Sequence, residues 1–258
     1  MTKRRTGWTA VVLAGLLFAA VLAFMPALAP VFAWAFPGIE PPVYDGETFV
    51  TLWLSHAGLV ATASLVSAVL AVGLGIFVTR PAGRDFRVLA DALATIGQSC
   101  PPVAVLAVAV PAVGYGPLPT FIALAIYGLL PILENTIAGL ESVPAAVREA
   151  ATGMGLSPLQ VLRQVELPLA GATILAGIRT AVVINIGTAT IGSTVGAVTL
   201  GTPIIDGLVG DKLPYVVQGA VVVGLFAVFT DLVLEAWGRL VSPPAAKSAL
   251  GKAKANPA

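Results

Sequence analysis

One polar stretch stands out from a chain in which 57% of the residues are hydrophobic. Residues 149–168 read EAATGMGLSPLQVLRQVELP and carry Glu149, Arg163 and Glu166. Carboxylate and guanidinium groups on short helices can form ion pairs with another protein. The two alanines after Glu149 leave room for a second surface to approach closely. The stretch is therefore a candidate contact surface.

The local pattern predicts two short helices joined by a tight turn. Residues 145–154 are rich in helix formers, and Gly155 is placed to end that helix in a left-handed conformation. Ser157 and Gln160 have the S-x-x-Q spacing of a capping box, and Pro158 suits the first turn of the next helix. The expected unit is a helix, a glycine turn and a second helix.

The second helix is expected to be amphipathic and short. Leu159, Leu162 and Val165 recur at helical spacing, and Leu167-Pro168 is expected to end the helix. Three interpretations remain: a connector lying on a membrane, a DNA-binding helix-turn-helix, or a docking element for a cytoplasmic protein. DNA binding is disfavoured because the stretch has one arginine against two glutamates and lacks phosphate-neutralising charge.

Several kinds of chemistry are disfavoured by composition. The single histidine, His56, and the single cysteine, Cys100, do not suit a metal centre, a histidine-based catalytic site or an internal disulfide. No G-x-x-x-x-G-K-[ST] phosphate loop is present, so the chain cannot bind ATP by that route, and we expect no cofactor. A net charge of +1 gives no reason to expect nucleic acid as a partner.

The elements that carry this stretch are expected to be membrane helices. Charged residues make up 10% of the chain, against about 25% in a typical soluble protein. Several apolar runs approach or exceed the roughly 20 residues that span a bilayer. The fold expected is all-α, a polytopic bundle of about six spans at 8–36, 56–78, 88–113, 118–133, 174–197 and 216–233.

Positive charges indicate the orientation of these spans. Six spans put both termini on one side, together with twelve lysines and arginines, and leave Lys212 on the other side. The positive-inside rule then predicts that both termini are cytoplasmic. The first 29 residues also have features of a cleaved signal peptide, but the long apolar run and the five later spans favour a retained helix.

Polar residues inside the spans are candidates to line a solute path. Pro101 and Pro102 interrupt the third span, and broken backbone at membrane depth can line a cavity, although a simple proline kink is the alternative. Hydroxyls and an amide gather in the fifth span. The candidates are Gln98, Ser99, Cys100, Tyr127, Asn185, Thr188, Thr190 and Ser193.

Charges within the spans are functional candidates by default: Arg179, Asp231 and Glu134. Arg179 is expected to reach the interface or to pair with Glu134. Glu235 and Arg239 are spaced for an ordinary i,i+4 ion pair. We interpret His56 as a hydrogen-bonded residue near the outer interface rather than as a proton relay.

The polar stretch resembles the EAA loop of ABC importer permeases. That pattern is Glu-Ala-Ala, three residues, Gly, nine residues, an aliphatic residue, one residue, then Leu-Pro. The chain matches each spacing, with Val165 where Ile is commoner. The resemblance implies a coupling helix that sits in a groove of a separate ATPase. The residues carried over are Glu149, Ala150, Ala151, Gly155, Leu159, Arg163, Leu167 and Pro168.

The resemblance extends over residues 44–240, where segments such as ALAIYGLLPILENTIAGLESV and TLGTPIIDGL are similar to osmoprotectant permeases. Within that group the chain is most similar to low-affinity Yeh-type glycine betaine permeases. This implies a type I ABC importer permease fold with a core over 44–240 and an EAA coupling loop at 141–170. Residues 1–43 would form the first helix and an outer loop, and 241–258 a disordered cytoplasmic tail.

The implied function is import of a quaternary ammonium osmoprotectant, of the glycine betaine or choline class, across a bacterial inner membrane. Expected partners are an ABC ATPase, a second permease subunit, identical or related, a periplasmic substrate-binding protein and membrane lipid, but no nucleic acid. The alternative is an ion-coupled secondary transporter. It is disfavoured because neither inverted repeats nor midplane carboxylates are clear in the sequence.

Overall fold

A computed structural model describes the backbone of residues 2–241 and the side chains of residues 8–240. These residues form helices and no strand. Five helices are long: α1 (Thr2–Phe24), α3 (Phe49–Val78), α6 (Pro117–Glu141), α9 (Leu167–Ala189) and α11 (Leu213–Val241). The shorter ones are α2 (Ala29–Ala35), α4 (Arg87–Ser99), α5 (Pro102–Val113), α7 (Ala145–Gly153), α8 (Pro158–Val161) and α10 (Thr202–Val209). The tail expected over 241–258 lies outside the described residues, apart from Val241.

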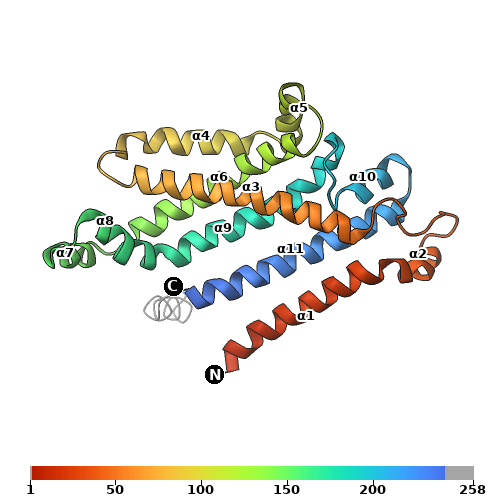
Figure 1. The fold of residues 1–258 in the computed structure, drawn as a ribbon, viewed down its shortest axis with the longest axis horizontal. Helices are drawn as coiled ribbons and strands as arrows, with labels where there is room; N and C mark the ends of the chain where they lie inside the picture. Colours follow the sequence, from red (N-terminus) through yellow and green to blue (C-terminus); the bar gives the residue numbers. More distant parts are fainter. Residues whose placement is uncertain (1, 242–258) are drawn as a thin grey trace, which may run out of the picture.

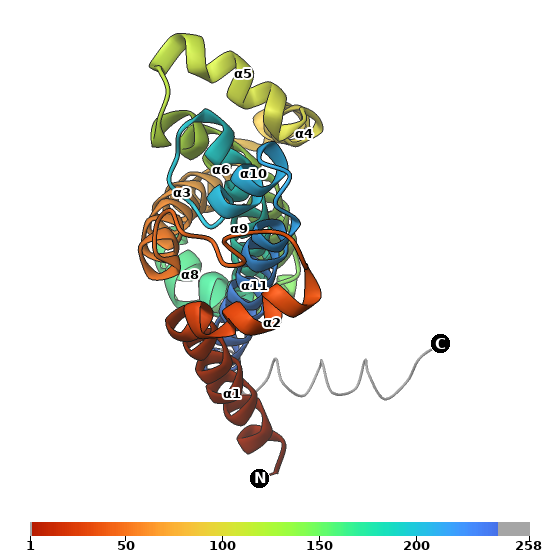
Figure 2. The ribbon, with the colours of Figure 1, turned by 90° about the vertical axis from the view of Figure 1, so that its right-hand side faces the viewer.

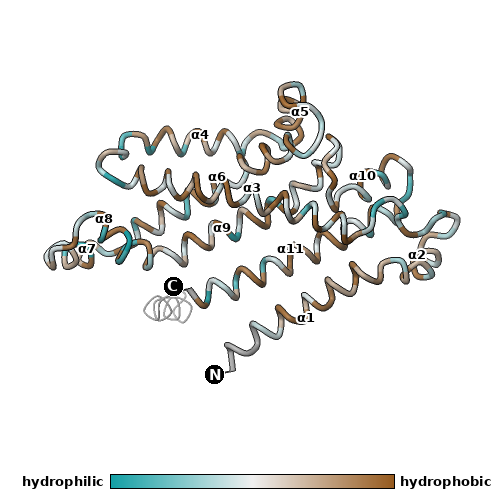
Figure 3. The backbone as a smooth tube through the Cα atoms, viewed as in Figure 1, coloured by the Kyte–Doolittle hydropathy of each residue, from teal (hydrophilic) through white to brown (hydrophobic). Residues whose placement is uncertain are grey.

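The long helices run along a common direction, as Figure 1 shows. Helices α7 and α8 lie at one end, near the turn between α3 and α4, and α2 and α10 lie at the other end. Seen end-on, α4 and α5 follow one edge of the bundle and α1 the opposite edge (Figure 2). The backbone is apolar along the helices and more hydrophilic at the two ends (Figure 3). This is the distribution expected of a bundle that crosses a lipid bilayer.

Five stretches are long and apolar enough to cross a membrane: Trp8–Ala35, Phe49–Val78, Pro117–Glu141, Pro158–Val195 and Leu213–Leu240. The expected third span is not one straight helix, because Arg84–Ser99 and Pro102–Val113 meet at an angle of 94°. The break falls at Cys100 and Pro101, and Pro101 is the first of the two prolines that predicted it. The six expected spans are therefore five uninterrupted candidates and one broken helix.

The core lies where α6 packs between α3 and α9 and where α11 joins α1 to the bundle. Buried aliphatic side chains such as Leu52, Leu124 and Ile186 fill the first contact. At the second, the ring of Phe18 stacks on Phe226, with centroids 5.6 Å apart. Apolar burial and ring packing thus fix the helices that carry the polar segments at the two ends.

Two expectations about the polar stretch are wrong. Leu167-Pro168 does not end a helix, because the chain continues from Pro158 to Val195 as one candidate span. A proline in a regular α-helix would collide with the carbonyl four residues earlier. The chain forms a π-helical turn over Leu162–Glu166 directly before Pro168, and the helix continues. The predicted apolar face is also different: Leu159 is 55% exposed, whereas Val161 is buried.

Candidate functional site

The polar stretch forms a helical hairpin, defined here as residues 145–161. Gly155 has φ +86°, the left-handed conformation predicted for it. Its N–H donates to the carbonyl of Thr152 at 2.9 Å, and the N–H of Leu156 donates to Ala151 at 3.2 Å. These bonds use carbonyls left free at the end of α7. The chain therefore reverses within a few residues and starts α8.

The start of α8 is fixed by the predicted capping box. The hydroxyl of Ser157 accepts from the backbone N–H of Gln160 at 3.4 Å, and the Gln160 side chain accepts from the N–H of Ser157 at 2.8 Å. Pro158 occupies the first turn, where a missing N–H costs no hydrogen bond. The hairpin is therefore specified by its own local sequence.

The hairpin presents an exposed surface of mixed chemistry. Ala151 is buried, whereas Glu149 is exposed, as is Arg163 two residues after the hairpin. Met154 is 75% exposed and Leu159 is 55% exposed. Glu149 makes no ion pair with any residue that the structure describes. Exposed apolar side chains beside unpaired charge are typical of a surface that contacts another protein.

Glu166 anchors the hairpin to the bundle. Its side chain is only 2% exposed, and Oε2 lies 2.6 Å from Nη2 of Arg80, which follows α3. Oε1 lies 3.7 Å from Nη1 of Arg148 on α7. One carboxylate thus joins the end of α3, the hairpin helix α7 and the π-helical turn before α9. A movement of α7 is therefore linked to two core helices through a single buried ion.

Two of the polar residues near the broken helix donate hydrogen bonds to backbone carbonyls. Nε2 of Gln98 donates to the backbone carbonyl of Tyr127 at 3.0 Å, which joins α4 to α6. The Ser99 hydroxyl donates to the Thr95 carbonyl of its own helix, and Cys100 is exposed. Tyr127 is buried, and its hydroxyl has no hydrogen-bond partner in the described chain. Gln98 and Tyr127 are brought together, while Ser99 and Cys100 remain at the surface.

The polar residues of the fifth span separate into two groups. Asn185 is fully buried, and its Nδ2 donates to the Ser64 hydroxyl on α3 at 3.0 Å. Thr188 and Thr190 donate to carbonyls of their own helical turns. Ser193 lies 2.8 Å from the Thr199 hydroxyl, in the turn after α9. Asn185 therefore joins two core helices, and the other three bond within 184–202.

The expected pairing of Arg179 with Glu134 is wrong. Arg179 binds both oxygens of Asp231 and lies 3.2 Å from Oε2 of Glu235, both on α11. Glu235 also pairs with Arg239, as the i,i+4 spacing predicted. Glu134 is exposed on α6. The intramembrane charges Arg179 and Asp231 thus serve as one link between α9 and α11.

Residues 71–243 match the family described as binding-protein-dependent transport system inner membrane component, and the match includes the whole hairpin and Glu166. The chain belongs to this family.

Other members of the family are close relatives. The osmoprotectant import permease protein OsmY of Salmonella typhimurium is 38% identical, over 84% of this chain and 91% of that protein. The glycine betaine/carnitine/choline transport system permease protein OpuCB of Bacillus subtilis is 39% identical, over 69% and 85%. The choline transport system permease protein OpuBB of Bacillus subtilis is 36% identical, over 73% and 86%.

Solved structures confirm the fold class. The permease-like chain of an inward-facing form of the MetNI methionine ABC transporter superposes with a TM-score of 0.67 at 20% identity. The likeness covers 75% of this chain and 96% of that chain. The predicted all-α membrane bundle of the type I ABC importer permease kind is therefore confirmed.

Family membership settles the general role of this inner membrane component. It is a multi-pass permease subunit of an ABC importer, and the family implies a separate ATPase and a substrate-binding protein as partners. ATP hydrolysis therefore belongs to another chain. The ion-coupled secondary transporter is not favoured by any of these similarities.

Sequence reasoning missed the anchoring role of Glu166 in this inner membrane component. In the sequence, Arg80 and Arg148 counted only among the positive charges that indicate the orientation of the membrane spans. A weak signal was present, since Glu166 is a charged residue between the apolar residues Val165 and Leu167. Its partners lie in distant parts of the chain, so sequence alone could not name them.

Proposed function

We propose that this chain is the permease subunit of an ATP-driven importer of a quaternary ammonium osmoprotectant, of the glycine betaine or choline class. A separate ATPase docks on the hairpin and drives the transport cycle. The substrate class rests on the names of relatives that are 36–39% identical. The docking site rests on one observation: the hairpin places Glu149 and an exposed apolar surface at one end of the helical bundle.

The hairpin end carries the charge expected of a cytoplasmic face. Arg80, Arg84, Arg87 and Arg148 lie there, whereas helix α10 and the described loops at the opposite end carry Asp45, Glu47, Asp206 and Asp211 beside the single Lys212. The positive-inside rule supports a cytoplasmic location for the hairpin and for both termini. An ATPase that binds ATP in the cytoplasm would meet the permease at this face.

Movement at the hairpin has a route into the bundle. An ATPase that shifts α7 moves Arg148 and, through Glu166, the end of α3 and the start of α9. A second permease subunit, identical or related, completes the solute passage between two copies. The large apolar surfaces of α4 and α5, which include Val88 and Val108, are available for such contacts or for lipid.

Substrate selection is assigned to the periplasmic binding protein. A quaternary ammonium group is recognised mainly by aromatic faces, and strong sites cluster several rings around it. The described spans bring together Phe18, Phe226 and Phe229, but these rings stack on one another in the core. The permease then offers a passage of low affinity. Tight betaine binding by the purified permease alone would contradict this assignment.

The docking proposal is tested by substitutions in the hairpin. Glu149→Ala removes an exposed charge, and Gly155→Ala adds about 1–2 kcal/mol of strain at a left-handed position without a steric clash. Each is expected to lower ATP-dependent uptake about ten-fold, the effect of losing about 1.4 kcal/mol of docking free energy. Uptake of labelled glycine betaine and ATP hydrolysis are measured in liposomes that contain the complete transporter.

Matched controls exist in the same chain. Gly153→Ala changes a helical glycine two residues away that also has open space around it, and Glu47→Ala removes an exposed carboxylate at the opposite end. Both are expected to leave coupling unchanged. If ATP hydrolysis still drives uptake at the normal rate in the Glu149 and Gly155 variants, with the membrane bundle intact, the docking proposal is wrong.

A further inference from the structure

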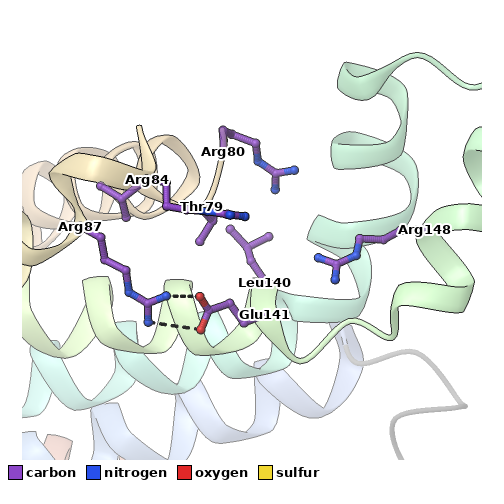
Figure 4. A pocket seen from close by; sticks show the side chains of 8 residues that line it. Thr79, Arg80, Arg84, Arg87, Leu140, Glu141 and Arg148 are labelled. Atoms are coloured by element: carbon purple, nitrogen blue, oxygen red, sulfur yellow. Dashed lines mark hydrogen bonds and ion pairs between the residues drawn. The ribbon is translucent and has the colours of Figure 1, made fainter. Parts of the chain in front are cut away.

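Beside the hairpin lies a pocket of about 330 Å³ whose walls carry four arginines. Arg80 follows α3, Arg84 lies in the 3-10 turn before α4, Arg87 begins α4 and Arg148 belongs to α7. Figure 4 shows their side chains around the space, with Glu141 of α6 held by Arg87. Two stretches of chain, residues 80–87 and α7, thus bring guanidinium groups to one place.

The arginines outnumber the carboxylates that neutralise them. Glu166 lies within ion-pair distance of Arg80 and Arg148. Glu141 pairs with Arg87, and Asp91 adds a longer contact to Arg87 at 3.9 Å. Arg84 is exposed and makes no ion pair with any described residue. The pocket therefore favours an anion, and bidentate guanidinium groups suit phosphate oxygens.

The pocket lies at the boundary of the apolar bundle. Two candidate spans end at its walls, one at Val78 and the other at Glu141. The rings of Phe77 and Phe86 lie 5.9 Å apart beside it and are about half exposed. Exposed apolar rings at the level of a cationic pocket are suited to the interface between lipid headgroups and acyl chains. This depth favours an anion that belongs to the membrane.

A second space extends the same site into the apolar region. A crevice of about 200 Å³ lies between α3, α4 and α6, and all of its lining side chains are apolar. Its wall residue Leu74 is one turn deeper than Val78, Ala90 is one turn beyond Arg87, and Leu133 is two turns from Leu140. The same three helices therefore form a cationic pocket at their end and a hydrocarbon crevice below it.

We propose that the arginine pocket binds the phosphate of an anionic phospholipid, whose acyl chain lies in the crevice between α3, α4 and α6. Basic pockets between membrane helices on the cytoplasmic side are suited to such headgroups. A soluble phosphate would match the arginines but would leave the crevice unused. The proposal does not depend on which solute is carried.

The test uses the full-length chain, purified in detergent and titrated with phosphatidylglycerol or phosphatidylethanolamine under native mass spectrometry. The chain is expected to retain phosphatidylglycerol selectively. Arg84→Gln is expected to lower its affinity about five-fold, the factor equivalent to about 1 kcal/mol for one arginine near an anionic surface. Arg84 has no ion-pair partner to lose, so this variant should fold. Ala94→Leu, which fills the crevice, is expected to weaken retention as well.

Controls distinguish the lipid from other anions. Arg239→Gln changes an arginine on α11, outside the pocket, and should leave retention unchanged. Equal binding of the two lipids, or unchanged affinity in Arg84→Gln, would overturn the proposal. Displacement of phosphatidylglycerol by millimolar inorganic phosphate would identify a soluble-anion site instead. Displacement by the ATPase subunit would show that the arginines serve a protein contact, and either displacement overturns the lipid assignment.

Discussion

Buried polar side chains secure both ends of the bundle, but they do so with different groups. At the hairpin end, the carboxylate of Glu166 lies between Arg80 and Arg148. At the end with α2 and α10, the amide of Gln218 accepts from the backbone N–H of Tyr44 at 3.0 Å and donates to the carbonyl of Pro42 at 2.8 Å. The buried polar side chain at the first end is an ion, and the one at the second end is a neutral amide.

His56 extends the neutral pattern at the second end. It is fully buried, its Nε2 lies 3.1 Å from the Ile186 carbonyl, and its Nδ1 accepts from the N–H of Leu200 at 3.2 Å. Both ring nitrogens are therefore in use, with the proton on Nε2. The expectation that His56 is a hydrogen-bonded residue is confirmed.

The difference has a physical consequence for movement. Neutral hydrogen bonds in an apolar interior hold one geometry, because an unpaired partner has no water to replace it. Arg80 and Arg148 are 32% and 40% exposed, so their ion pairs with Glu166 can exchange with water and are partly screened by salt. The hairpin end is therefore easier to rearrange than the opposite end.

The largest effect is expected from Glu166→Ala. This change leaves two arginines facing a buried site without their carboxylate, and removal of one partner of a buried ion pair costs about 3–5 kcal/mol. Because both arginines reach water, we expect a loss of about 3 kcal/mol in the free energy of unfolding. Denaturant unfolding of the purified chain in detergent measures it.

Glu141→Ala is the matched control for that change. It breaks the exposed pair with Arg87 at the same end, which is worth at most about 1 kcal/mol. Similar losses in the two variants would mean that the burial of Glu166 has no special role in holding the hairpin to α3 and α9.

An intermediate effect is expected from Gln218→Leu. The substitution leaves the N–H of Tyr44 and the carbonyl of Pro42 without partners, at a cost of about 2 kcal/mol in the free energy of unfolding. The loss should be the same in 0.15 M and 1 M salt, whereas the loss from Glu166→Ala should shrink in 1 M salt. Gln164→Leu, at an exposed glutamine, serves as control. Equal salt dependence at the two ends would remove the contrast between them.

The smallest effect is expected from Tyr44→Phe. Burial, followed by the hydrogen bond that its hydroxyl donates to Asp206, raises the pKa of Tyr44 to about 12. Since the ordinary pKa is 10, the neutral phenol is favoured in the folded chain. The stabilisation that the neutral Tyr44 phenol contributes is complete below pH 10 and is lost as the pH rises toward 12. Thermal unfolding midpoints of wild type and Tyr44→Phe, of which the wild type is the more stable, should therefore converge over that interval. A gap that stays constant from pH 8 to 12 would show that the phenol proton is not involved.

Short-range sequence signals predicted the hairpin well. The left-handed Gly155 and the capping box of Ser157 and Gln160 involve residues at most five positions apart, so their geometry depends little on the rest of the chain. The same holds for the break beside Pro101 and for the i,i+4 pair of Glu235 and Arg239. The family motif could be read from the sequence for the same reason.

The course of the chain around Pro168 was less predictable. Proline usually ends a helix, and the sequence offered no local sign that a π-helical turn would accommodate it. Packing of α9 against α6 and α3 favours continuation of the helix through this point. The continuation of the helix through Pro168 therefore depends on contacts with distant helices, which no short stretch of sequence contains.

The sequence by itself determined the presence of about six apolar stretches, the hairpin with its caps and the positive charge of one end, because each arises from composition or from neighbours within a turn or two. Only the tertiary structure decided which charges meet. Glu166 could have stayed in water, and Arg179 could have paired with Glu134, yet helix packing brings Arg80 to the first and Asp231 to the second. The bond from Tyr44 to Gln218 joins residues 174 positions apart. Such pairings follow from the relative placement of whole helices, which apolar packing sets and no local pattern encodes.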